Sequence, residues 1–238
     1  MPSRIKTFGT FLFTMLKKYK IPLIAIFSVL FIDQFIKIYI KLHYTLGEET
    51  YVAGDWFRIS FTENPGMAFG LEFGGDYGKL ILSSFRILAS IAGIWYVIHM
   101  VKKGEHPGFI LSVSLILAGA IGNILDSAFY GILFSESGEY DLAKFMPPEG
   151  GYAGFLHGRV VDMFHFPIWN GKFPSWFPIW PGEDFEFFRP VFNFADFSIS
   201  CGVGIILVFQ KKFIKENKEQ IPATDSTAEN SNKGTPNS

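Results

Sequence analysis

The stretch GFILSVSLILAGAIGNILDSAFYG (residues 108–131) decides the fold class of this chain. Three further apolar runs, at about 21–42, 79–100 and 193–210, also approach the roughly 20 residues that a membrane-spanning helix needs. Over the whole chain, 49% of the 238 residues are hydrophobic and 28 are phenylalanine. A soluble core does not need such long apolar runs, so the sequence predicts an α-helical polytopic membrane protein with four transmembrane helices.

Basic residues mark one side of the predicted bundle. With four spans, the N-terminal segment, the connection between spans two and three, and the segment after span four all fall on the same face. The positive-inside rule makes that face cytoplasmic, so both termini are expected in the cytoplasm and the long loops 43–78 and 132–192 outside. The residues that carry this charge are Arg4, Lys6, Lys17, Lys18, Lys20, Lys102, Lys103, Lys211, Lys212, Lys215 and Lys218.

Three parts follow from this threading: a basic interfacial segment (1–20), a four-span domain (21–213) and a disordered cytoplasmic tail (214–238). In the first outer loop, the alternating pattern of WFRISFTEN (56–64) predicts a strand of a small β-sheet on the outer face. The second outer loop is predicted to be extended, and its aromatic residues are of the kind that prefer the headgroup level.

Four polar side chains inside the apolar runs need an explanation. Asp33 and Lys37 are four residues apart, so they can form an ion pair on one helix face. Residues of this type within a span are also candidates for function. Asn123 and Asp126 must find partners away from lipid, while the small residues of the same segment, GAIGNILD (119–126), allow another helix to come close.

Two shorter stretches, HGRVVDMF (157–164) and FNFADF (192–197), each place one carboxylate in an apolar setting. Each has a structural interpretation. Asn193 with Asp196 three residues later is typical of a helix start, and VVDMF can end an amphipathic strand. The topology nevertheless brings Asp126, Asp162 and Asp196 to the same outer face by independent routes.

A pair of carboxylates that meet in a low-dielectric site shares one proton, since both cannot ionise cheaply. The ionised member can take a proton from water while the neutral member donates to a peptide carbonyl. A metal site built from His157, Asp162 and His165 lacks a recognised ligand spacing. A membrane transporter or channel and a scaffold with an aromatic outer loop remain as alternatives. No metal or cofactor is expected, and nothing indicates nucleic-acid binding.

At this point the sequence resembles the lipoprotein signal peptidases (signal peptidase II). The resemblance rests on motifs that follow one another in order along the chain. They are Asp33-Gln34-x-x-Lys37, Asn64-x-Gly66-x-Ala68-Phe69-Gly70, Gly119-x-x-Gly122-Asn123-x-x-Asp126, Val160-Val161-Asp162 and Phe192-Asn193-x-Ala195-Asp196.

This resemblance implies a membrane-embedded aspartic endopeptidase of the bacterial cytoplasmic (inner) membrane. It would remove signal peptides from diacylglyceryl-modified prolipoproteins, on the N-terminal side of the lipidated cysteine, with its active site at the outer face. Its partners would be the diacylated prolipoprotein and membrane lipids. The motifs imply a catalytic pair, Asp162 and Asp196. They imply substrate-positioning or supporting roles for Asn64, Asn123, Asp126 and Asn193, with Asp33 holding the fold.

The chain also departs from the family pattern. Ser127 follows Asp126 where the family motif usually continues with arginine, and Arg159 or Arg86 is a candidate replacement. The second outer loop carries extra sequence at about 132–157 and 166–190, which can cover the site or contact partners.

Overall fold

The computed structural model describes residues 2–65, 75–167, 169–187 and 190–219. Its long helices confirm the predicted fold class, because four segments are long and apolar enough to cross a membrane: Leu16–His43, Leu80–Lys103, Pro107–Leu133 and Phe194–Ile214. The helices themselves are α1 (Pro2–His43), α2 (Gly75–Lys103), α3 (Pro107–Leu125) and α5 (Phe194–Glu219). Helix α3 continues into one π-helical turn, η2 (Asp126–Tyr130), and a short helix, α4 (Gly131–Leu133).

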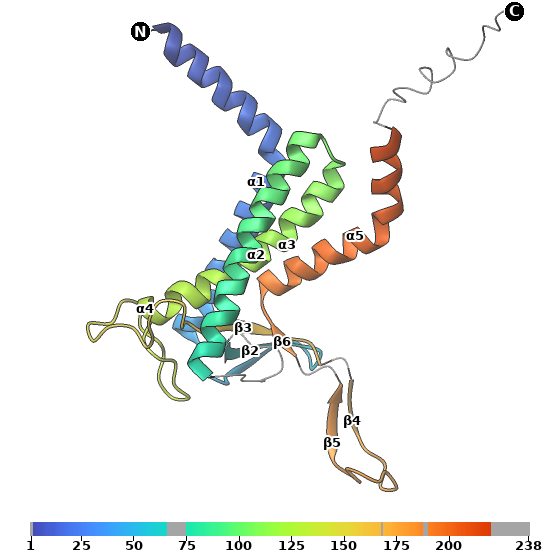
Figure 1. The fold of residues 1–238 in the computed structure, drawn as a ribbon. Coiled ribbons are helices and arrows are strands. Elements are labelled where there is room, and N and C mark those ends of the chain that lie inside the picture. The colour runs from blue at the N-terminus through green and yellow to red at the C-terminus, as the bar shows by residue number, and fades with distance from the viewer. Residues whose placement is uncertain (1, 66–74, 168, 188–189, 220–238) are drawn as a thin grey trace, which may run out of the picture.

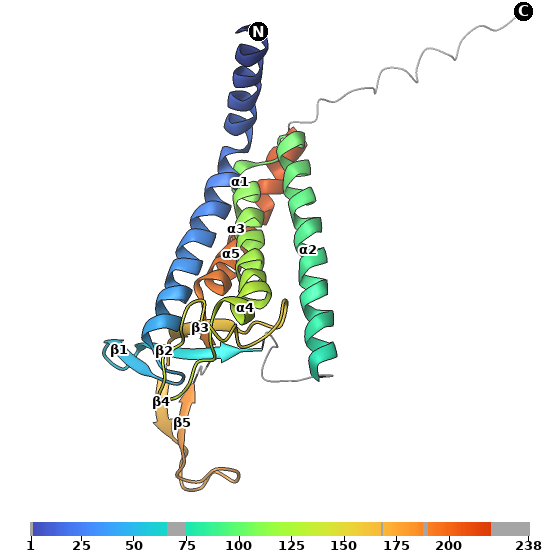
Figure 2. The same cartoon turned by 90° about the vertical axis from the view of Figure 1, so that its left-hand side faces the viewer.

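The two ends of the bundle differ in what they hold. The N-terminus, the α2–α3 connection and the end of α5 lie at one end, and a β-sheet lies at the other (Figures 1 and 2). This arrangement groups the basic residues as the sequence predicted. At their end of the bundle, Gly104 adopts φ +77° directly after α2, and the side chain of His106 caps α3 by accepting a hydrogen bond from the backbone N–H of Gly108 at 3.0 Å.

Two helix ends differ from the predicted division of the chain. Residues 2–43 form one continuous helix, so the predicted basic segment and the first span share one element, and the interfacial position of that segment stays a prediction. Helix α5 continues to Glu219, and residues 214–219 are therefore helical where the sequence predicted the start of a disordered tail. The rest of that tail, 220–238, lies outside the described residues.

A four-stranded antiparallel sheet of order β1-β2-β3-β6 closes the other end of the bundle. Its strands are β1 (Glu49–Ala53), β2 (Phe57–Asn64), β3 (Val160–His165) and β6 (Val191–Phe192). The strand predicted at 56–64 is confirmed as β2. In the register of β2 with β3, Thr62 lies opposite Asp162 and Asn64 lies opposite Val160, so β2 runs beside the part of β3 that carries Asp162. Asp162 therefore lies on a strand and not on a loop.

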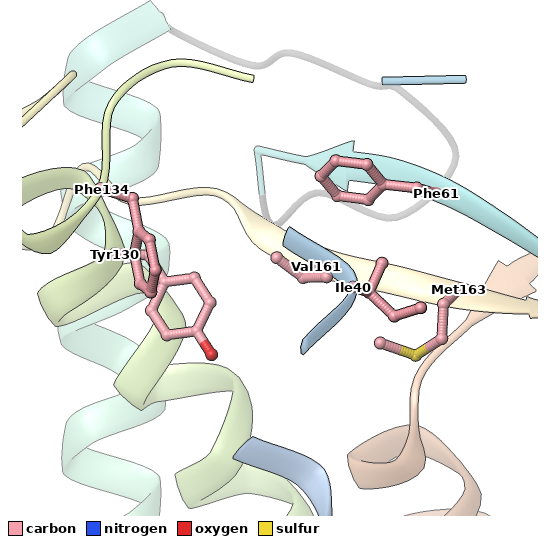
Figure 3. Close-up of a cluster of buried hydrophobic side chains, with 6 residues drawn as sticks. All are labelled: Ile40, Phe61, Tyr130, Phe134, Val161 and Met163. Carbon is pink, nitrogen blue, oxygen red and sulfur yellow. The ribbon is translucent and has the colours of Figure 1, made fainter. Parts of the chain in front are cut away.

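A cluster of buried apolar side chains fastens this sheet to the helices. Figure 3 shows the members of the cluster, which come from α1, from η2, from the residue after α4, and from β2 and β3. Burial of such side chains stabilises the contact by about 1.5–3 kcal/mol each. Its members are Ile40, Phe61, Tyr130, Phe134, Val161 and Met163.

The two insertions of the second outer loop have different structures. Residues 134–159 form an irregular segment with several turns, which folds back on itself at an antiparallel bridge between Phe134 and Phe145. Residues 169–187 contain a separate hairpin, β4 (Trp169–Lys172) and β5 (Asp184–Phe187), which projects away from the bundle (Figure 1).

Candidate active site

Asp162 and Asp196 reach the same site from different elements. Asp162 lies in the middle of β3 and is 5% exposed, whereas Asp196 lies in the first turn of α5. Burial and, after it, the nearby negative charge of Asp196 together raise the pKa of Asp162 to about 7. The fold thus brings together the two carboxylates that the sequence singled out.

Asn193 connects the carboxylate of Asp162 with the backbone at Asp196. Its side-chain oxygen accepts a hydrogen bond from the backbone N–H of Asp196 at 3.0 Å, which caps α5. Its side-chain nitrogen donates to Oδ1 of Asp162 at 2.7 Å and to Oδ1 of Asn123 at 3.1 Å. The predicted helix-start interpretation of Asn193 is therefore confirmed, and the same side chain also reaches the site.

Asn123 extends this connection into α3 and α1. Its side-chain nitrogen donates to Oδ1 of Asp196 at 2.9 Å. Its oxygen accepts from the ammonium of Lys37 at 2.9 Å. Asn123 was expected to need partners away from lipid, and it finds three of them in the site.

Behind the pair lies a buried ionic cluster. Lys37 forms the predicted ion pair with Asp33 at 3.0 Å and a second one with Asp126 at 2.8 Å, and all three side chains are fully buried. Gln34 donates to both carboxylates, at 3.1 Å to Asp33 and 2.8 Å to Asp126. Asp126 is thus occupied by this cluster, and it also accepts from the backbone N–H of Val161 beside Asp162 at 3.3 Å.

Asp33 also fixes the start of α5, because its Oδ1 accepts the backbone N–H of Ala195 at 2.8 Å. This contact requires close approach of three helices. A Cβ atom at Gly122 would lie 2.8 Å from Oδ2 of Asp33, and one at Gly119 would lie 2.3 Å from the carbonyl oxygen of Ala195. The small residues of α3 therefore admit α1 and α5 to the site, as the sequence predicted for a neighbouring helix.

Gly158, which precedes β3, allows a similarly close approach to the end of α3. Its N–H donates to the carbonyl oxygen of Ser127 at 2.8 Å, and a Cβ atom there would lie 2.2 Å from the carbonyl oxygen of Asp126. The approach brings β3 against the π-helical turn at the end of α3. Turns of this kind often occur at functional sites.

The other expected site residues lie at its border. Asn64 ends β2 opposite Val160, and the remainder of its motif, 66–70, lies outside the described residues. Of the two candidate arginines, Arg86 on α2 faces the pair and interacts electrostatically with Asp196 and Asp162. Arg159 instead bonds Glu63 at 3.3 Å and Glu136 at 3.0 Å.

A second buried ionic cluster was missed by the sequence analysis. Lys41 is fully buried and bonds Glu63 and the hydroxyl of Ser137, the latter at 2.9 Å. Its ammonium also lies 5.0 Å from the centre of the Tyr152 ring. This cluster ties the first insertion to α1 and to the end of β2. The spacing of Lys41, four residues after Lys37, was the signal that could have placed both on one helix face.

The motif residues of this site also lie within a match to a known protein family. The family model described as signal peptidase (SPase) II matches residues 25–211 of this chain. The chain belongs to the signal peptidase II family. That match contains all of the motif residues on which the resemblance was based.

Two relatives illustrate how far the similarity to this family extends. A lipoprotein signal peptidase of Porphyromonas gingivalis is 47% identical over 216 residues, covering 89% of this chain and 92% of the relative. A lipoprotein signal peptidase of Amoebophilus asiaticus is 34% identical over 214 residues, covering 89% and 86%. The matches to these relatives therefore extend over most of the chain.

Solved structures agree at the level of the fold. One bacterial membrane enzyme, solved by the in meso method, aligns with a TM-score of 0.54 at 21% identity and covers 84% of this chain and 93% of its own. A second aligns with a TM-score of 0.51 at 22% identity, covering 80% and 92%. The signal peptidase II fold of this chain is therefore that of known membrane enzymes.

Proposed function

We propose that this chain is a membrane-embedded aspartic endopeptidase that removes signal peptides from diacylglyceryl-modified prolipoproteins, with Asp162 and Asp196 as the catalytic pair. Family membership supports the cleavage of lipoprotein signal peptides. The observation that carries the mechanism is a path of hydrogen bonds between two carboxylates, which runs from buried Asp162, whose pKa is raised, through Asn193 and Asn123 to Asp196. A pair of this kind holds one proton between two acids at neutral pH.

The mechanism uses both states of the pair. The ionised carboxylate takes a proton from a water molecule as the water attacks the carbonyl carbon of the scissile peptide. The protonated carboxyl donates to the carbonyl oxygen as the tetrahedral intermediate forms. Collapse of that intermediate breaks the C–N bond: the leaving nitrogen takes the proton that the base removed from water, and a hydroxyl of the intermediate returns a proton to the other carboxylate, which restores the pair. The C–N bond would lie on the N-terminal side of the lipidated cysteine.

The position of the pair suits this substrate. Asp162 lies in the sheet that closes the bundle, and Asp196 lies in the first turn of a spanning helix. The proposal places this end at the outer face of the bacterial inner membrane, with both termini cytoplasmic. The lipid chains would then stay in the bilayer while the scissile bond meets the pair at the interface, where water is available. Asn64 would contact the substrate from the end of β2.

The test is cleavage of a synthetic diacylated prolipoprotein peptide by purified protein in lipid nanodiscs. Wild type is expected to cleave before the lipidated cysteine, and Asp162→Asn and Asp196→Asn each to lose at least about a thousandfold in rate, since acid and base roles contribute about 10²–10⁴ each. Asp184→Asn is the matched control, because Asp184 is 80% exposed on the hairpin. Full cleavage by Asp162→Asn or by Asp196→Asn would refute the assignment of these two residues as the catalytic pair. If one of these variants still cleaves and Asp126→Asn does not, Asp126 would take its place in the pair.

A further inference from the structure

The two carboxylates of the site differ in what surrounds them. Lys37 has three N–H donors and no acceptor, and these donors meet Asp33, Asp126 and Oδ1 of Asn123. The ammonium therefore fixes the orientation of the Asn123 amide, because only the oxygen of that amide can face a lysine. The amide nitrogen must then point at Asp196, where it donates to Oδ1 at 2.9 Å.

Asn193 is fixed in the same way. Its oxygen faces the backbone N–H of Asp196, so its nitrogen must supply the two remaining contacts, to Asp162 and to Asn123. The side chains of Lys37, Asn123 and Asn193 therefore form one chain of hydrogen bonds with a single possible direction. This chain places the positive charge of Lys37 one amide away from Asp196 and two amides away from Asp162, so the charge acts on both carboxylates but is linked more directly to Asp196.

The helix adds to this asymmetry. Asp196 lies in the first turn of α5, where the positive end of the helix dipole favours a negative charge. Asp162 lies in a strand, and among the described residues it accepts a hydrogen bond from Asn193 alone. Arg86 on α2 interacts electrostatically with both carboxylates, and more strongly with Asp196 than with Asp162.

We propose that Lys37, acting through the amide of Asn123, holds Asp196 as the ionised member of the pair, so that Asp196 activates the water and Asp162 enters the reaction as the proton donor. Lys37 and Asn123 are positioning residues in this assignment. The base and acid roles rest on the proposed function, but the order in which the two carboxyl groups lose their protons does not. The order can therefore be measured without a substrate.

The measurement is an infrared titration of the carboxyl C=O band in protein reconstituted in nanodiscs. Subtracting the spectra of the Asp162→Asn/Asp196→Asn double variant from those of each single variant isolates the one remaining carboxyl. The Asp196 carboxyl is expected to lose its proton at least about one pH unit below the Asp162 carboxyl. Loss of the proton in the opposite order, or at the same pH, would overturn the proposal.

The hydrogen-bonded relay from Lys37 through Asn123 to Asp196 is tested by adding Asn123→Ala to the Asp162→Asn variant. Deprotonation of Asp196 is expected to move up by about one pH unit, since the oriented donor is lost while the Lys37 ion pairs stay in place. Lys41→Met is the matched control, because Lys41 is equally buried one turn further along α1 but bonds Glu63. An unmoved Asp196 titration in Asn123→Ala, or an equal shift in Lys41→Met, would show that the relay does not act.

Cleavage gives a second readout in the otherwise unmodified enzyme. Asn123→Ala is expected to lower kcat about tenfold on the acid side of the pH–rate profile, where Asp196 is then protonated, with little change in KM. The alkaline fall, which reports Asp162, is expected to stay in place. A shift of the alkaline side alone would reverse the two roles. A wild-type protein that does not cleave the substrate would refute the proposed function and leave the titration order to be decided by the infrared data.

Discussion

Replacing Asp162 by asparagine removes the ability of this side chain to ionise while keeping its shape. The asparagine oxygen can still accept the hydrogen bond that Asn193 donates at 2.7 Å. The change therefore tests the electrostatic cost of the carboxylate in the folded protein, and Asp184→Asn on the exposed hairpin is the matched control.

The expected magnitude follows from the pKa of Asp162, which burial raises from 3.8 to about 7 in the folded protein. Between these two values the folded state holds a proton that the unfolded state has released, so the free energy of unfolding falls as pH rises. The window of 7 − 3.8 ≈ 3 pH units corresponds to about 4 kcal/mol at about 1.4 kcal/mol per unit. The penalty is absent below about pH 4 and complete above about pH 7.

Asp162→Asn is consequently expected to match wild type in stability near pH 4 and to exceed it increasingly as pH rises, by up to about 4 kcal/mol at pH 8. Thermal unfolding in detergent micelles, followed at pH 5, 6, 7 and 8, measures this as a difference in Tm that grows to roughly 10 °C. Asp184→Asn should stay within about 0.5 kcal/mol at every pH. A variant that is less stable than wild type by the same amount at every pH, or whose advantage shrinks toward pH 8, would refute the reasoning. The same titration predicts that cleavage falls above about pH 7, as Asp162 loses the proton that it donates.

Three further changes test the framework around the pair. Gly202→Ala should lower the free energy of unfolding by a few kcal/mol in denaturant titrations, because the new Cβ would lie 2.5 Å from a backbone oxygen of α3. Gly204→Ala on the same helix is the control: its Cβ meets nothing within 4 Å, and the change should be neutral or slightly stabilising. Lys41→Met should cost about 3 kcal/mol of unfolding free energy by leaving buried Glu63 with Arg159 as its remaining cation, and an unchanged stability would contradict the cluster. Asn193→Ser should keep the helix cap and hence most of the stability but lose cleavage, and equal loss of both would show that capping is the whole role of this residue.

The sequence predicted the spans well because the bilayer leaves little freedom in their length. The stretch 108–131 was expected to cross the membrane, and Pro107–Leu133 does so by length and composition. Helix periodicity likewise predicted the pairing of Asp33 with Lys37. It could not predict that Asp126 completes that cluster, because spacing along one helix does not say which helix lies beside it.

The outer region was predicted less well, for two physical reasons. The hairpin at 169–187 escaped notice because prolines and a run of aromatic residues hide the alternation that marks strands. Lys41 was overlooked because a lysine at the end of a span usually extends its ammonium into the headgroup region. Here Glu63 and Ser137 satisfy it internally, and both come from segments distant in sequence.

The two interpretations of Asn193, helix cap and site residue, were alternatives in the sequence and are joined in the structure. Serine, threonine and aspartate also cap helices, but an ionised aspartate has no donor, and a hydroxyl has one hydrogen on a shorter stem. Asparagine combines an acceptor for the N–H of Asp196 with two donors, which reach Asp162 and Asn123. The residue that caps α5 therefore also donates to Asp162 and, through Asn123, links it to Asp196. A cap chosen only for helix stability would leave these contacts unspecified.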